Sequence, residues 1–84
     1  MKLESARRNI YGRICHLLQE KNVHLEKKGF PYWNITLANG RGIYILVHSD
    51  GSGVYVGNYG VWEGFSTMSP NDPRIIELVE RLTV

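Results

Sequence analysis

The sequence has no hydrophobic run long enough to cross a membrane and almost no cysteine. Its longest unbroken apolar stretch is 43–47, whereas a membrane-spanning helix needs about 20 apolar residues. Charged residues interrupt the first positions, where a secretory signal would carry its apolar stretch. Cys15 is the single cysteine, so no disulfide can form within the chain. We therefore expect a cytoplasmic protein that has no membrane partner.

Strong charge of one sign is also lacking. The net charge of +2 is too small to indicate nucleic-acid binding by itself. Between residues 29 and 70 the charged side chains are Arg41, Asp50 and Glu63. A stretch so poor in charge is either covered by the rest of the chain or offered to a partner. Internal repeats and linkers are absent, and 84 residues suffice for one domain, so we predict a single domain over 1–84.

The first segment has the pattern of an amphipathic helix. Its apolar residues recur at spacings of three and four; they are Leu3, Ala6, Ile10, Ile14, Leu17 and Leu18. Ser5 is the expected N-cap, because its hydroxyl accepts from a free backbone N–H. Gly29 and Pro31 form a strong stop signal, and we expect the helix to end near Asn22. Residues 23–25 are either its last turn or a short extended arm.

A three-stranded antiparallel meander follows. Alternating side chains, rich in β-branched and aromatic residues, predict the strands; these occupy 32–37, 43–48 and 54–57. Asp50-Gly51 signals a two-residue type I′ turn, in which both residues need a positive φ. That turn pairs Val47 with Val54 and brings the aliphatic residues of both strands to one face.

The first hairpin allows two registers. A two-residue Asn39-Gly40 loop would set the aliphatic faces of the two strands opposite each other. A three-residue loop over 38–40, with Gly40 left-handed, pairs Ile35 with Ile43 and keeps those faces aligned. We prefer the second register, because a slip of one residue turns every side chain to the other face.

A short helix closes the chain. Asp72 is its expected N-cap and Pro73 fits its first position. The predicted buried residues are Ile75, Ile76, Leu78, Val79 and Leu82. The whole is an α+β fold, ordered α-β-β-β-α, with both helices on the aliphatic face of the sheet.

The opposite face of the predicted sheet is aromatic. Strand alternation gives it Tyr32, Asn34, Tyr44, Leu46, His48 and Tyr55, with Tyr59, Trp62 and Phe65 close by. Aromatic side chains that carry a polar group are enriched at binding hot spots. Three interpretations stay open: residues 61–70 cover the face, the face binds a protein, or its tyrosines stack on nucleic-acid bases. In a protein complex the expected anchors are Tyr32, Tyr44, Tyr55, Tyr59 and Trp62.

The first helix offers a second candidate surface. Arg7, Arg8 and Arg13 either contact phosphates or form a solvated helix face. The element order resembles that of double-stranded-RNA-binding domains, which implies RNA binding. That family has a lysine cluster at the start of its last helix and a His-bearing loop between its first two strands. Here these segments read Asn-Asp-Pro-Arg at 71–74 and Ala-Asn-Gly-Arg at 38–41.

Residues 42–57 carry a second resemblance. Gly-Ile-Tyr at 42–44 and Tyr-Val-Gly at 55–57 look like the paired motif of the GIY-YIG nucleases. The resemblance implies a hairpin whose tyrosines lie near a metal-dependent hydrolytic site, with an arginine on the next helix and a later glutamate. The chain has no Arg or Lys between Val56 and Pro73, so the arginine is missing where the family places it.

No other pattern indicates catalysis, a metal or a cofactor. His16, His24 and His48 lack the spacing of metal ligands. We expect a non-catalytic protein-binding module, a small regulator or inhibitor of the kind carried by phages and other mobile elements, which occludes a partner protein. The alternative is a nucleic-acid-binding module that uses the basic face of the first helix. A homodimer, joined through the sheet face or an edge strand, is a third hypothesis.

Overall fold

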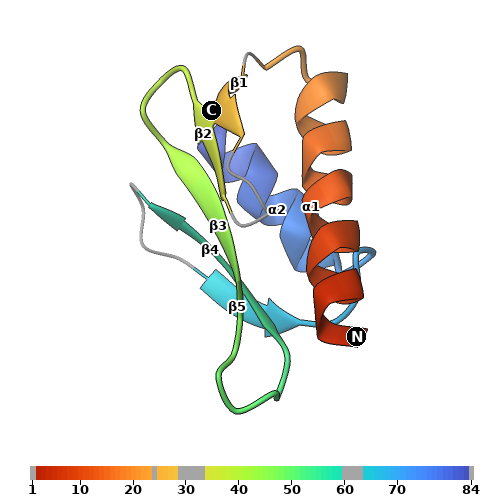
Figure 1. Ribbon diagram of the computed structural model, residues 1–84. Helices are drawn as coiled ribbons and strands as arrows, with labels where there is room; N and C mark the ends of the chain where they lie inside the picture. Colours follow the sequence, from red (N-terminus) through yellow and green to blue (C-terminus); the bar gives the residue numbers. More distant parts are fainter. Residues whose placement is uncertain (1, 24, 29–33, 60–63, 84) are drawn as a thin grey trace.

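Two helices lie on one side of an antiparallel sheet in the computed structural model (Figure 1). The structure describes residues 2–23, 25–28, 34–59 and 64–83. Its elements, in chain order, are α1 (Lys2–Glu20), β1 (Leu25–Lys28), β2 (Asn34–Leu37), β3 (Gly42–Val47), β4 (Val54–Tyr59), β5 (Gly64–Thr67) and α2 (Pro73–Leu82). The strands are neighbours in the order of the chain, β1-β2-β3-β4-β5. The predicted α+β class, with a helix at each end of an antiparallel meander, is confirmed.

The prediction of three strands is wrong, since the sheet has five. β2, β3 and β4 correspond to the predicted strands, and the additional β1 and β5 form its two edges. β1 reads Leu-Glu-Lys-Lys and β5 reads Gly-Phe-Ser-Thr. Neither has the alternation that identifies a half-buried strand. An edge strand has one strand neighbour, so its sequence carries a weaker signal.

The first hairpin has the predicted three-residue loop. Ile35 pairs with Ile43, and Gly40 adopts a φ of 86°. In the second hairpin the predicted register is confirmed, because Val47 pairs with Val54. The type I′ turn is wrong: Gly51 has a positive φ, but Asp50 does not.

A longer loop replaces that turn. The N–H of His48 donates to the carbonyl of Gly53, so four residues, 49–52, connect the strands. The Asp50 carboxylate accepts from the Ser52 N–H at 2.9 Å. The side chain and the backbone N–H of Ser52 both form hydrogen bonds to the Asp50 carboxylate, and these bonds lower the pKa of Asp50. Local bonding by the Asp side chain therefore offers an alternative to the tight turn.

Helix α1 buries the predicted apolar stripe, with Tyr11 added to it. Ala6, Ile10, Ile14, Leu17, Leu18 and Tyr11 are all buried, whereas Leu3 is half-buried. Ser5 is not the N-cap, because the helix already includes Lys2. The predicted end near Asn22 is confirmed: this residue has a φ of 56°, and the N–H of Val23 donates to the carbonyl of Leu18. A left-handed residue followed by this bond is a common helix ending.

Helix α2 begins as predicted. Asp72 caps it by accepting from the Arg74 N–H, and Pro73 occupies the first turn. Ile76 was expected on the buried side but is 38% exposed, since it lies about 100° around the helix from Ile75. At its other end the Leu82 carbonyl accepts from the side chains of Asn39 and Arg41.

The core fills the space between the helices and one face of the sheet. α1 packs on β3 and β4 and against α2. The aliphatic side chains of β2, β3 and β4 meet both helices in one cluster, and half-buried Cys15 packs against it. Among the described residues no helix is both long and apolar enough to span a membrane.

Candidate functional site

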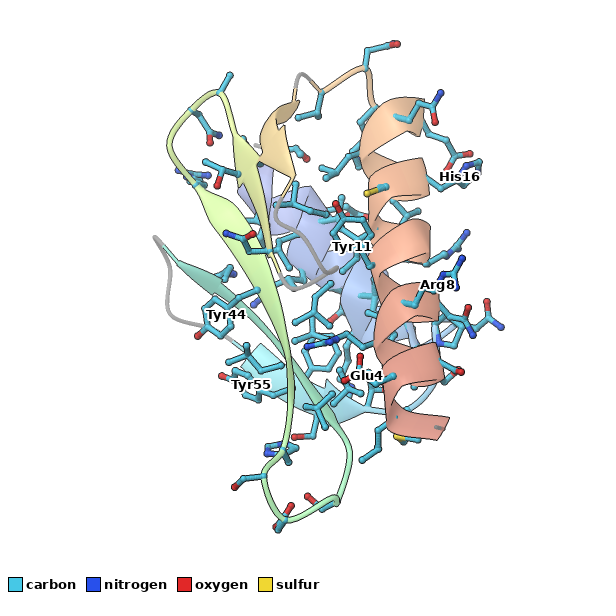
Figure 2. The ribbon with its side chains drawn as sticks, viewed as in Figure 1. Glu4, Arg8, Tyr11, His16, Tyr44 and Tyr55 are labelled. Atoms are coloured by element: carbon cyan, nitrogen blue, oxygen red, sulfur yellow. The ribbon has the colours of Figure 1, made fainter. Side chains whose placement is uncertain are left out.

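The face of the sheet that points away from the helices carries a pair of tyrosines. Tyr44 comes from β3 and Tyr55 from β4, and their ring centroids are 6.0 Å apart with 29° between the ring planes. Figure 2 shows both rings on the side of the sheet opposite α1. We call the described side chains of this surface the outer face; they are Asn34, Thr36, Tyr44, Leu46, His48, Tyr55, Ser66 and Met68.

Two glycines determine how these rings lie. A Cβ on Gly57 would come within 2.8 Å of both Tyr44 Cζ and Tyr55 Cε2, and one on Gly64 would clash with the Tyr55 hydroxyl. Such distances are far below van der Waals contact, so only glycine leaves room for the rings. Tyr44 therefore lies across Gly57, and Tyr55 extends over Gly57 and Gly64. Both side chains thus lean across the sheet at positions where the glycines have no Cβ.

His48 and Ser66 extend this site to the edge of the sheet. His48 Nε2 and Ser66 Oγ are 2.8 Å apart, which links the end of β3 to β5. The His48 ring also meets the Tyr55 ring edge-on, with centroids 6.1 Å apart and 70° between the planes. These contacts hold Tyr55 between His48 and Tyr44 on the surface.

The outer face is open over the part of the chain that the structure describes. Residues 61–70 were one candidate cover, but 64–67 form β5 and extend the sheet sideways. Two large apolar side chains stay exposed beside the tyrosines, Leu46 at 42% and Met68 at 47%. Tyr44 and Tyr55 themselves are half-buried, as expected for rings with one covered surface.

Phe65 lies on the other face of the sheet, contrary to expectation. It pairs with Val56 in the register of β4 and β5, and it packs against the core. The Arg74 guanidinium is 4.7 Å from the centre of its ring. The same guanidinium donates to the Ser66 carbonyl at 3.1 Å and to the Asp72 carboxylate at 2.7 Å. These contacts join the start of α2 to β5.

Three of the predicted anchors are not placed as side chains. Tyr32 and Trp62 lie outside the described residues. Tyr59 ends β4 and its backbone pairs with Gly42, but its side chain also lies outside the described part. Of the five predicted anchors, the structure thus brings together Tyr44 and Tyr55.

The described side chains of the outer face are uncharged, while Lys27 of β1 is in register with Thr36 of this face. No Asp, Glu, Lys or Arg occurs among its described side chains as defined above. Arg41, from the adjoining loop, donates instead to the Arg81 and Leu82 carbonyls on the helix side. Burial raises the pKa of Tyr44, and the neighbouring Tyr55 raises it further. The phenol of Tyr44 is accordingly neutral at physiological pH.

The three candidate arginines of α1 point in different directions. Residues in a helix are about 100° apart, so Arg7 and Arg8 differ by that angle, and Arg13 lies more than about 100° from both. Arg7 pairs with Glu4 at 2.5 Å, and its side chain is 16% exposed. Figure 2 shows Arg8 on the far side of α1 from Tyr44 and Tyr55. The arginines therefore form no single patch and do not join the outer face.

The strands that resemble the GIY-YIG motif lie side by side. Tyr44 pairs with Gly57, and Leu46 pairs with Tyr55. The element after β4 is the strand β5, whereas the family places its arginine on a helix. In the described residues, no three His, Cys, Asp or Glu side chains come together as a set of metal ligands.

Sequence reasoning missed two features of this site, Gly57 with Gly64 and the strand that carries Gly64. The signal was a glycine beside a tyrosine across each strand pair, Gly57 directly opposite Tyr44 and Gly64 diagonal to Tyr55, and it requires the strand pairing to be known. Comparisons with protein-family models, curated proteins and solved structures give no match to this chain. The geometry of the outer face is thus the basis for a functional proposal.

Proposed function

We propose that this protein is a protein-binding module whose contact surface is the outer face, with Tyr44 and Tyr55 as anchors. The observation that carries the proposal is the stacked tyrosine pair on a sheet face that no described element covers. Tyrosine buries a large area at little conformational cost and offers a hydroxyl for hydrogen bonding. Such residues dominate the binding energy of protein interfaces.

The surroundings of the tyrosines support a protein partner. Leu46 and Met68 add exposed apolar surface next to the pair, and the unbranched Met side chain adapts to irregular partners. Ser66, His48 and the two phenols supply polar groups at the same surface. An apolar centre with interspersed hydrogen-bonding groups is the composition of a protein interface. A small domain that binds in this way regulates or inhibits its partner by covering part of the partner's surface.

Nucleic-acid binding has weaker support. Phosphate contacts need clustered cations, and the arginines of α1 diverge, with Arg7 engaged by Glu4. Base stacking on the tyrosines would lack a cluster of cations beside it, because among the described strand positions Lys27, in register with Thr36, is the one that brings a cation to this face. Self-association through the outer face is a form of the same proposal in which the partner is a second copy.

The double variant Tyr44→Ala/Tyr55→Ala tests the proposal. Tagged wild-type protein, the double variant and Arg8→Ala/Arg13→Ala are used to capture partners from host lysate, with nuclease treatment and a salt gradient. We expect one protein to be retained by wild type and by the arginine variant. The tyrosine variant should bind it at least about 30-fold more weakly, since the loss of even one such anchor costs about 2 kcal/mol or more.

The folding of each variant must be measured as a control, because the tyrosines also contact the sheet and their loss can destabilise it. Circular dichroism and thermal unfolding of each variant distinguish lost contacts from lost structure. Undiminished partner affinity in a folded double variant would contradict the proposal. Captured material that disappears with nuclease or low added salt would favour the arginines of α1 instead. Light scattering of the purified protein reports whether the partner is a second copy.

A further inference from the structure

A charged side chain lies over the free edge of β5. We propose that Arg74 keeps this edge from pairing with β5 of a second copy of the chain, and that its removal produces a dimer joined edge to edge. The proposal concerns backbone hydrogen bonds at the edge of the sheet and does not rest on the function proposed for the outer face. Three observations lead to it: the direction of the backbone groups of β5, the contacts of Arg74, and the sequence of the strand.

The register of the sheet determines which backbone groups of β5 point outward. The N–H of His48 donates to the carbonyl of Gly53 at 2.9 Å, so these residues form a hydrogen-bonded pair between β3 and β4. Such pairs recur at every second position of an antiparallel ladder, and Tyr55 therefore also bonds to β3. The residue of β5 opposite Tyr55 is Ser66, whose backbone N–H and C=O consequently point to the free edge. Those of Gly64, two positions earlier, point the same way.

Arg74 engages one of these outward groups. Its guanidinium donates to the Ser66 carbonyl at 3.1 Å, which agrees with the direction deduced from the register. Two hydrogen bonds to the Asp72 carboxylate, at 3.1 Å from Nε and 2.7 Å from Nη2, hold the guanidinium in place. Asp72 is fixed in turn as the N-cap of α2. The start of the helix thus positions a cation on the edge of the sheet.

A strand that pairs with β5 must displace Arg74. The incoming strand needs the Ser66 carbonyl as an acceptor, and the guanidinium already lies where the backbone N–H of that strand would donate. A hydrogen bond from a charged donor is also stronger than one from a backbone N–H. Pairing therefore replaces a stronger bond with a weaker one at this carbonyl, and the contact opposes association.

The sequence of β5 makes a second copy its complementary partner. In an antiparallel pair of β5 strands centred on Phe65, Gly64 of each copy lies opposite Ser66 of the other. Both residues have outward N–H and C=O groups, so each such pair exchanges two backbone hydrogen bonds. The strand reads Gly-Phe-Ser-Thr, which sets no like charges opposite each other. A two-fold axis through this centre closes the assembly as a dimer.

The other edge of the sheet has its own protection. β1 reads Leu-Glu-Lys-Lys, and its register with β2 shifts between Leu25 and Lys27. Lysines and irregular pairing on an edge strand both oppose addition of another strand. β5 pairs with β4 without a shift and contains no lysine. A side chain from outside the strand, that of Arg74, takes this role at β5.

The experiment compares Arg74→Ala with the wild type and with Arg81→Ala. Arg81 lies in the last turn of α2, so the control removes the same side chain and charge from the same helix. Sedimentation equilibrium over a range of protein concentrations measures the dissociation constant of the dimer. We expect it to be at least about tenfold lower in Arg74→Ala than in the wild type, because neither copy then gives up a charge-assisted hydrogen bond on pairing. Arg81→Ala should equal the wild type.

A proline in β5 tests whether the edge is the contact. Ser66→Pro removes an N–H that points outward, and an edge strand accepts proline where the missing N–H breaks no bond of the sheet. Arg74→Ala/Ser66→Pro should therefore return to the wild-type dissociation constant. Amide hydrogen exchange, followed by NMR, locates the contact directly. Association of Arg74→Ala should slow the exchange of the N–H groups of Gly64 and Ser66.

The outcomes are distinct from those for the outer face. The proposal is overturned if folded Arg74→Ala associates no more than the wild type, if adding Ser66→Pro leaves its association unchanged, or if exchange slows on β3 instead of β5. Circular dichroism reports whether each variant is folded. The function proposed for the outer face is tested by Tyr44→Ala/Tyr55→Ala, which retains Arg74, so either proposal can fail while the other stands. Tighter association of Arg74→Ala that Ser66→Pro reverses supports the role of Arg74.

Discussion

The two faces of the sheet have opposite characters although the same strands build both. On β3, Ile43 and Ile45 are fully buried under the helices, whereas Leu46, the next residue along, is 42% exposed. The inner face is aliphatic and packed. The outer face has half-buried tyrosines that lie over glycines. Alternation along one strand is thus enough to divide its residues into a set that stabilises the core and a set available for contact.

Substituting neighbours on β3 should give the largest difference between the faces. We expect Ile45→Ala to lower the free energy of unfolding by about 2–5 kcal/mol, because it opens a cavity in the core. Leu46→Ala should change it by no more than about 0.5 kcal/mol, as for other surface positions. Urea unfolding followed by circular dichroism measures both. Equal losses of unfolding free energy in the two variants would show that the outer face is also buried in the isolated protein. The two faces would then not differ in the way described.

The helix on the inner face should be sensitive to acid. Asp72 caps α2 and pairs with Arg74 at 2.7 Å, and the hydrogen bonds from Arg74 hold its pKa well below the usual range. A carboxylate with a lowered pKa in the folded protein stabilises it above about pH 4, the unfolded value, and this contribution is lost as pH falls below that. Asp72→Ala should cost about 1 kcal/mol at neutral pH.

Asp72→Asn is the matched variant for this effect. Its amide oxygen still accepts from the Arg74 N–H, so part of the capping energy remains, but the group no longer titrates. Unfolding of wild type and both variants between pH 2 and pH 7 makes the comparison. If the wild type lost no more stability than Asp72→Asn on acidification, the ion pair at the start of α2 would contribute nothing.

The smallest effect concerns the outer face itself. Burial and the neighbouring Tyr55 raise the pKa of Tyr44, so the fold favours its neutral phenol. That contribution is present below about pH 10 and is lost as pH rises through the raised pKa. NMR titration of the ring resonances should show the pKa of Tyr44 falling in Tyr55→Phe, because burial then remains as the main cause. An unchanged pKa would mean that the Tyr55 hydroxyl does not interact with the Tyr44 phenol.

Much of this architecture follows from local patterns. The stripe from Ala6 to Leu18, the left-handed Gly40 and the Asp72 cap are properties of short segments, and the structure has each of them. The prediction of Ser5 as the N-cap and the prediction of a type I′ turn at Asp50 were wrong for a common reason. Each relied on one favourable residue, while the helix began earlier and Asp50 bonded to Ser52 instead.

The candidate site was predicted in part. Alternation placed Tyr44 and Tyr55 on one face, and the pairing of β3 with β4 confirms it. The position of Phe65 was wrong because β5 was not foreseen, and a residue's face is defined only once its strand is known. Arg7, Arg8 and Arg13 looked clustered in the sequence but diverge around α1, since neighbours in a helix differ by about 100°.

Local sequence patterns specify the α+β class, the two helices, three central strands and the registers of their hairpins. These depend on periodicity and turn residues, which act over a few positions. It is the packing of distant segments that sets β5 beside β4 instead of over the tyrosines and places the two tyrosines across Gly57 and Gly64. Contacts between strands join residues distant in the chain, and no local pattern specifies which backbone a side chain will cover.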